Sequence, residues 1–149
     1  MKAHENQYRH DGIIPYITHP ESVYNLLKEI GIENNNTLCA AWLHDTIEDC
    51  ELTKEYIEYE FNSNIANLVA QLTKNCGREK YLERIKEADY DVQIIKLADI
   101  VHNCSTLNEA MPKKIKHKVE DCKELYFELS EKICPKFHYK LQKYLEPWL

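Results

Sequence analysis

The sequence predicts an all-α fold: a compact, single-domain bundle of about seven to nine helices. Apolar residues recur at helical spacing along most of the 149-residue chain, and only 3 glycines and 5 prolines interrupt that pattern. No segment shows the sustained alternation of apolar and polar residues that predicts a half-buried strand. A chain of this length can bury one core, so residues 1–149 are expected to form one domain.

The composition narrows the class of partner. Hydrophobic residues make up 44% of the chain, as in ordinary globular proteins. The net charge is −6 and the one short basic run lies at 112–118, so nucleic acid is not an expected partner. No segment approaches the roughly 20 apolar residues of a membrane span, and the polar start is unlike a secretory signal. We therefore expect a cytoplasmic protein without a membrane partner, and a homo-oligomer is compatible with the sequence.

The first half of the chain is expected to hold five helices. Residues 2–10 form a short one, which Gly12 in "HDGIIP" ends. Thr18 is the expected N-cap of the next helix, at about 19–30, and Gly31 ends it. The other three helices of this half are expected at about 36–49, after an N-cap at Thr53, and after an N-cap at Ser63.

The second half is expected to hold four further helices. The run "KNCG" at 74–77 breaks the chain before a short amphipathic helix at about 78–88. Asp89 then caps a helix that extends to about 108 and includes "VQIIKLADIVHNCSTL", the most apolar stretch of the sequence. The C-terminal helices, within 112–145, are expected near 113–133 and 135–145, separated at the Cys134–Pro135 step.

A cluster of ionisable side chains follows the apolar run "LCAAWL". In "WLHDTIEDC", His44 and Asp45 are adjacent, and Glu48 and Asp49 each follow four residues later. In one continuous helix each such pair shares a face, so three carboxylates would lie close together. A bound cation is the simplest way to relieve their repulsion and the cost of burying charge. The alternative is a capping or solvated face, which the preceding apolar residues disfavour.

Two further polar features favour the same chemistry. Asp99, Asn103 and Thr106 occur at i, i+4 and i+7 and form a polar stripe on an otherwise apolar helix, as in a pocket wall. His19, at a helix start, is a third candidate, although a lone histidine there is more often a capping or surface residue. Two histidines and two carboxylates would suit Mn, Fe or Zn better than Ca or Mg. Such an ion can lower the pKa of water and polarise a phosphoryl group, while neighbouring carboxylates transfer protons.

The sequence resembles the HD superfamily of metal-dependent phosphohydrolases. More narrowly, it resembles the hydrolase domain of RelA/SpoT-type proteins and the stand-alone small alarmone hydrolases. The resemblance implies a helical bundle of the HD-domain type, with its core motifs within residues 3–107. Four segments carry it, in family order: "AHENQYRHDGIIPYITHP" at 3–20, "CAAWLHDTIEDC" at 39–50, "LVAQLTK" at 68–74 and "IIKLADIVHNCSTL" at 94–107.

The same resemblance implies a set of site residues. It implies one metal ion, usually manganese (Mn²⁺), with Fe²⁺ or Zn²⁺ as alternatives. The implied metal ligands are His19, His44, Asp45 and Asp99. Glu48 is implied as the main catalytic carboxylate, with Asp49 assisting the nucleophilic water. The implied substrate contacts are Arg9 with the guanine ring, Asn103 and Thr106 with the nucleotide, and Lys74 with a phosphate.

The implied reaction removes the 3′-pyrophosphate of ppGpp or pppGpp, which gives GDP or GTP and pyrophosphate. Two positions depart from the family pattern: Ile100 replaces an arginine, and His10 replaces a lysine or arginine. These departures keep a second hypothesis open, in which the same metal chemistry acts on another nucleotide, such as NADPH or a deoxynucleotide. A third, a non-catalytic nucleotide-binding module, is disfavoured because both carboxylates for proton transfer, Glu48 and Asp49, are present.

Overall fold

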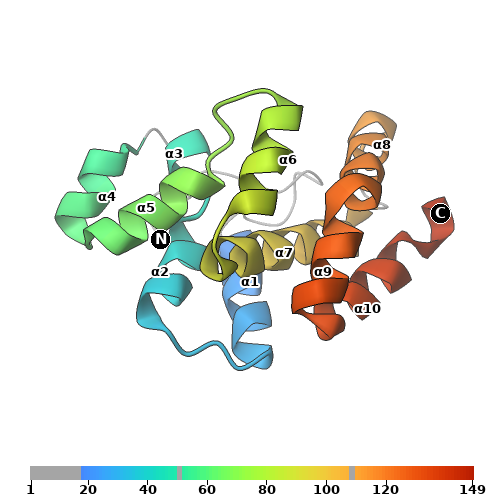
Figure 1. Cartoon of the computed structure of the whole chain (residues 1–149), viewed down its shortest axis with the longest axis horizontal. Coiled ribbons are helices and arrows are strands. Elements are labelled where there is room, and N and C mark those ends of the chain that lie inside the picture. Colours follow the sequence, from blue (N-terminus) through green and yellow to red (C-terminus); the bar gives the residue numbers. More distant parts are fainter. Residues whose placement is uncertain (1–17, 50–51, 108–109) are drawn as a thin grey trace.

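The computed structural model of the chain describes residues 18–49, 52–107 and 110–149. Every regular element in these ranges is helical, which confirms the predicted class (Figure 1). No helix in the same ranges is long and apolar enough to cross a bilayer. The elements are α1 (Thr18–Glu29), α2 (Asn35–Leu43), α3 (Thr46–Asp49), α4 (Lys54–Glu60), α5 (Ser63–Leu72), α6 (Arg78–Glu87), α7 (Tyr90–Ser105), α8 (Pro112–Asp121), the π-helix η3 (Cys122–Tyr126), α9 (Phe127–Ile133), α10 (Pro135–Leu145) and the 3₁₀-helix η4 (Glu146–Trp148).

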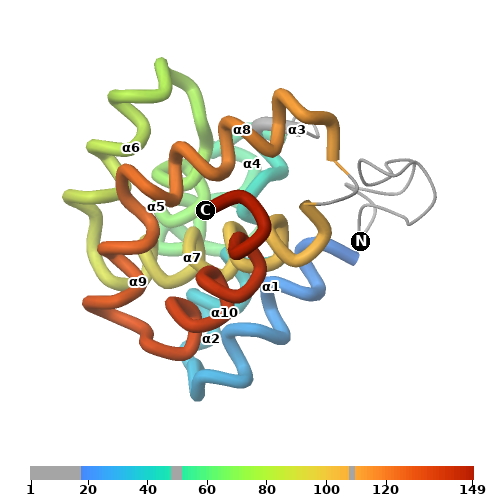
Figure 2. Tube along the Cα trace, turned by 90° about the vertical axis from the view of Figure 1, so that its right-hand side faces the viewer, coloured from blue at the N-terminus to red at the C-terminus, as the bar shows by residue number. Residues whose placement is uncertain are grey.

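Helix α7 is the central helix of the fold. It packs against α1, α2, α5, α6 and α10. Figure 1 shows it running through the middle of the molecule, with α6 above it and α1 below it, and Figure 2 shows α1 and α10 beside it. A helix that is apolar on most of its circumference is stable only when neighbours cover it on several sides. Its buried residues are Val92, Ile94, Ile95, Leu97, Ala98, Asp99, Ile100, Val101 and Cys104.

Helix α1 ends at a glycine, as predicted. Gly31 has a φ of +90°, in the left-handed region that glycine adopts without strain. Its N–H donates to the Lys28 carbonyl at 3.1 Å, and the Ile32 N–H donates to the Leu27 carbonyl at 3.0 Å. These two bonds form a Schellman motif, which satisfies the last carbonyls of the helix and turns the chain. The turn leads into α2, which packs against α1.

The predicted continuous helix over 36–49 is wrong. Helix α2 ends at Leu43, His44 and Asp45 form a turn, and α3 begins at Thr46. The two ionisable residues therefore lie at a helix end and not on a helix face. The predicted stacking of each over a carboxylate of the next turn does not apply.

Side-chain hydrogen bonds account for this break. Nδ1 of His44 donates to the Ala41 carbonyl at 2.7 Å, and Oγ1 of Thr46 donates to the Leu43 carbonyl at 2.8 Å. Side-chain donors three residues further along the chain compete for carbonyls that would otherwise accept helical N–H groups. The bonds that end α2 also fix the backbone on both sides of Asp45.

The N-caps of α4 and α5 test the boundaries predicted from polar residues. Thr53 caps α4 as predicted, because its Oγ1 accepts the Tyr56 N–H at 3.0 Å. The cap of α5 is Asn62, whose Oδ1 accepts the Ile65 N–H at 2.8 Å, so the prediction of Ser63 is wrong by one residue. Asparagine and serine are equally good N-caps, and adjacent candidates cannot be separated by type alone.

Residues 112–133 form one continuous helical stretch with a π segment inside it. The stretch matches the predicted helix near 113–133, and it begins at Pro112. Leu125 and Tyr126, adjacent residues of the π segment, are both buried in the core. Pro135 then begins α10, which confirms the predicted separation of the last two helices. The helix predicted over 2–10 lies outside the described residues.

Candidate metal centre

Four buried polar residues from three parts of the chain meet beside α7. His19 lies in the first turn of α1, His44 and Asp45 on the turn between α2 and α3, and Asp99 in α7. Each side chain belongs to a residue that is between 1% and 6% exposed. One ligand atom from each of His19, His44 and Asp45 lies within 4.8 Å of the others. The fold thus gathers the four residues expected as metal ligands.

The carboxylate of Asp99 is the acceptor that joins the histidines. Its Oδ1 accepts from Nε2 of His19 at 2.7 Å and from Nε2 of His44 at 3.3 Å. Nδ2 of Asn103 donates to the same oxygen at 3.2 Å. Nζ of Lys96 donates to the other oxygen, Oδ2, at 3.0 Å. Lys96 therefore holds the outer edge of the carboxylate and leaves Oδ1 directed at the two imidazoles.

The charge of Asp99 is set by these neighbours. Burial alone would raise the pKa of the Asp99 carboxyl. The Lys96 charge and the hydrogen bonds from both histidines outweigh burial and hold that pKa well below its ordinary value. The same pairing holds the pKa of Lys96 well above its ordinary value, although burial by itself would lower it. Asp99 is therefore an ionised carboxylate at neutral pH.

The main chain orients His44. Its Nδ1 lies 2.7 Å from the Ala41 carbonyl, and because a carbonyl can only accept, Nδ1 carries a proton. Nε2 is then the nitrogen that faces Asp99. Burial lowers the pKa of His44, but the hydrogen bond and charge of Asp99, together with the charge of Asp45, outweigh burial and raise it to about 9. The space beside Nε2 favours positive charge, whether a proton or a cation.

This donor set fits a divalent cation. The two Nε2 atoms face one carboxylate oxygen, and Asp45 adds a second carboxylate close to both imidazoles. Ca²⁺ and Mg²⁺ prefer ligand sets made of oxygen, whereas imidazole nitrogen suits Mn, Fe and Zn sites. A histidine ligand commonly donates its other ring N–H to a backbone carbonyl, as His44 does to Ala41.

Asn103, Thr106 and Lys74 were expected to contact the substrate, and the structure places them at three different positions. Asn103 contacts Asp99 directly, so it belongs to the cluster. Thr106 is the half-buried C-cap residue of α7, one turn beyond Asn103. Lys74 is exposed and follows Thr73, the C-cap of α5.

The remaining predicted site residues lie partly or wholly outside the described part of the chain. The backbone of Glu48 and Asp49 forms the end of α3, soon after the turn that bears two of the candidate ligands. Their side chains are not among those described. Arg9 and His10 also lie outside the described residues.

Two residues of the cluster received no role from the sequence. Lys96 pairs with Asp99, and His102 places its Nδ1 2.7 Å from Nδ1 of His19. Each lies three residues from Asp99 on α7, so helical spacing could have placed both near that carboxylate. The contact of His102 with His19 could not be read in the same way, because the two residues are 83 positions apart in the sequence.

The described chain is an all-α domain built around a candidate metal site. In that site two histidines and two aspartates are buried where three helical segments meet. The profile of the HD-domain family matches residues 1–133. The chain belongs to the HD-domain family.

Several curated bacterial proteins are similar to this chain. It is 32% identical over 143 residues to guanosine-3′,5′-bis(diphosphate) 3′-pyrophosphohydrolase of Haemophilus influenzae, covering 88% of this chain and 21% of that protein. The protein of the same name from Vibrio cholerae is 37% identical over 145 residues, covering 88% and 20%. A probable GTP pyrophosphokinase of Mycobacterium leprae is 34% identical over 142 residues, covering 89% and 18%. The chain spans about a fifth of the length of these relatives.

Solved structures confirm the fold. A metazoan orthologue of SpoT, described as hydrolysing ppGpp, superposes with a TM-score of 0.85 at 23% identity and covers 98% of this chain and 89% of that one. The protein lmo0812 from Listeria monocytogenes superposes with a TM-score of 0.72 at 21% identity and covers 90% and 96%. The predicted HD-type helical bundle is therefore correct.

Proposed function

We propose that this chain is a metal-dependent pyrophosphohydrolase that converts ppGpp or pppGpp, with water, to GDP or GTP and pyrophosphate. The observation that carries the proposal is the buried convergence of His19, His44 and Asp45 with Asp99. The names of the bacterial relatives support this choice of substrate. The sequence predicts a cytoplasmic location, which fits a nucleotide substrate.

His19, His44, Asp45 and Asp99 would hold one divalent ion, and we propose manganese. When bound, the ion supplies positive charge that polarises a phosphoryl group and lowers the pKa of water. The chain prepares the ligands for this role. Lys96 keeps Asp99 ionised, and Asn103 bonds the Asp99 oxygen that faces the histidines.

Glu48 and Asp49 would manage the protons of the reaction. A water oxygen forms a bond to the phosphorus attached to the ribose 3′-oxygen, and the bond between that phosphorus and the 3′-oxygen breaks. One carboxylate takes the proton from the water, and the 3′-oxygen gains a proton as it leaves. The place of both residues at the end of α3, next to the turn that bears His44 and Asp45, supports this role.

The nucleotide would be held by residues that the family resemblance implies. Arg9 would pack on the guanine ring, and Asn103 and Thr106 would line the nucleotide site. Lys74 would contact a phosphate. The position of Asn103 beside Asp99 supports a nucleotide lying along the polar stripe of α7.

The test is the release of pyrophosphate from ppGpp by metal-stripped protein to which Mn²⁺ is returned. We expect release that depends on Mn²⁺ and is lost in His44→Ala and in Asp45→Ala. His117→Ala, an exposed histidine on α8, should keep the wild-type rate. Unchanged release in His44→Ala would refute the site, and no release from ppGpp with any added metal would refute the reaction.

The same assay separates the alternatives that the sequence left open. NADPH and deoxynucleoside triphosphates are offered in parallel, and phosphate is measured alongside pyrophosphate. Parallel samples receive Fe²⁺ or Zn²⁺ in place of Mn²⁺. Faster turnover of NADPH or a deoxynucleotide than of ppGpp would assign another nucleotide to the same metal chemistry. Binding of ppGpp without turnover of any nucleotide would favour a binding module.

A further inference from the structure

We propose that His102 is a positioning residue: its Nδ1 accepts the Nδ1 proton of His19 when His19 binds a metal ion, and so leaves Nε2 of His19 available to that ion. The inference rests on the proposed metal centre. Nδ1 of His102 and Nδ1 of His19 lie 2.7 Å apart, and the two ring centroids are 4.9 Å apart with an interplanar angle of 30°. The contact joins α7 to the first turn of α1.

The distance between the two nitrogens dictates how they share hydrogen. At 2.7 Å, two lone pairs or two N–H groups would repel, so one Nδ1 must donate and the other must accept. If His19 carries its proton on Nδ1, its Nε2 lone pair is free for a cation, and His102 carries its proton on Nε2. If His102 donates from Nδ1, a neutral His19 carries its proton on Nε2 and donates it to Asp99 at 2.7 Å. Metal binding requires the first arrangement.

The two histidine ligands are therefore held by different kinds of partner. The Ala41 carbonyl can only accept, so it fixes His44 in one tautomer. An imidazole can donate or accept, so His102 supports His19 in either tautomer. His19 can pass between a bond to Asp99 and a bond to a cation while its hydrogen bond to His102 persists.

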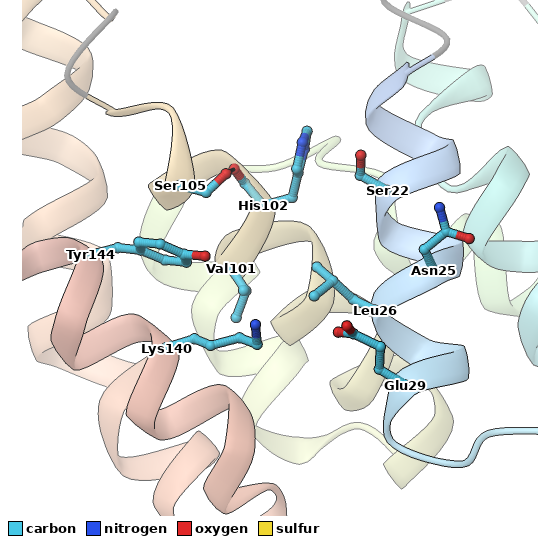
Figure 3. A pocket seen from close by; sticks show the side chains of 9 residues that line it. All are labelled: Ser22, Asn25, Leu26, Glu29, Val101, His102, Ser105, Lys140 and Tyr144. Atoms are coloured by element: carbon cyan, nitrogen blue, oxygen red, sulfur yellow. Dashed lines mark hydrogen bonds between the residues drawn. The ribbon is translucent and has the colours of Figure 1, made fainter.

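The surroundings of His102 suit this role. His102 is half-buried and lines a pocket of about 260 Å³ between α1, α7 and α10. Figure 3 shows it at one end of the pocket with Ser22 and Ser105, whereas the side chains of Lys140 and Tyr144 approach from α10. His102 is therefore partly exposed at the pocket while its Nδ1 contacts His19.

The experiment compares two substitutions of His102 by their affinity for Mn²⁺, measured by titration calorimetry on metal-stripped protein without nucleotide. His102→Asn places an oxygen near the position of Nδ1 and keeps an acceptor for His19. His102→Phe keeps a ring of similar size and removes the acceptor. We expect His102→Phe to weaken Mn²⁺ binding by about 10–100-fold, as the loss of a hydrogen-bond partner of a metal ligand typically does. The Mn²⁺ affinity of His102→Asn should remain within about threefold of that of wild type. His117→Ala serves as the matched control on an exposed surface.

A second readout observes the protons directly. Nitrogen-15 spectra of the histidine rings in Zn²⁺-loaded protein should place the proton of His19 on Nδ1 and that of His102 on Nε2. A proton on Nδ1 of His102 in the loaded protein, or equal Mn²⁺ affinity in His102→Phe and wild type, would overturn the inference. Wild-type protein that binds Mn²⁺ but does not cleave ppGpp would overturn the proposed substrate and leave the inference standing. Wild-type protein that binds no divalent metal would overturn both.

Discussion

Asp99 shows how one buried charge organises its surroundings. Three donors share its Oδ1, and Lys96 alone reaches Oδ2 among the hydrogen bonds of the described residues. A buried carboxylate is stable only when cations or hydrogen bonds replace the water it has lost. Lys96 is therefore a structural counter-ion of Asp99.

Lys96→Met should destabilise metal-stripped protein by about 3 kcal/mol, because it leaves the buried Asp99 without its nearest fixed cation. The measurement is the free energy of unfolding from urea titration. Lys86→Met is the control, since Lys86 is exposed on α6, and it should change stability by less than about 0.5 kcal/mol. Equal stability of Lys96→Met and wild type would show that the histidines alone compensate the Asp99 charge.

At the scale of single helices, the ends of the elements decide where the site residues lie. The Schellman motif at Gly31 ends α1 and directs the chain into α2. The bonds from His44 and Thr46 to carbonyls of α2 then end that helix at the turn that bears two candidate ligands, His44 and Asp45. Glycine spacing and cap residues predict the first of these ends. The second depends on side-chain bonds that periodicity does not report.

Gly31→Ala should destabilise the protein by about 1–2 kcal/mol, because an alanine at a φ of +90° is strained even where nothing crowds its Cβ. Gly77→Ala is the matched control. Its backbone has a φ of −62° and space for a Cβ, so the substitution adds no strain; alanine is only a poorer N-cap of α6 than glycine, and the loss should stay below about 1 kcal/mol. Thermal unfolding of both variants beside wild type is the measurement. A loss at Gly77 equal to that at Gly31 would contradict the backbone explanation.

At the scale of the whole molecule, the candidate centre depends on packing between segments that are distant in sequence. The bonds from His19 and His44 to Asp99 span 80 and 55 residues, and the contact of His19 with His102 spans 83. Motif order could predict that the four candidate ligands meet, because a family resemblance carries that arrangement. Neither motif nor spacing could predict the contact of His102 with His19, which depends on how α1 packs against α7.

Packing between distant segments also explains which of the predictions around Asp99 and His44 were correct. The apolar run around Asp99 predicted a buried helix, and α7 is the central helix of the described fold. The stretch "WLHDTIEDC" predicted a cation site from repulsion in one continuous helix, and that helix does not exist. The candidate ligands converge because α2 ends beside α1 and α7. Packing and not helical periodicity places His44 and Asp45 together with His19 and Asp99.

The number of Mn²⁺ ions bound per chain, measured on metal-stripped protein, tests the central claim most directly. One ion should bind to wild type and to His117→Ala. Asp45→Asn should lose this binding, because it removes a charged ligand from beside both histidines. Absence of stoichiometric binding by wild type, or equal binding by Asp45→Asn and wild type, would contradict a metal centre formed by these residues.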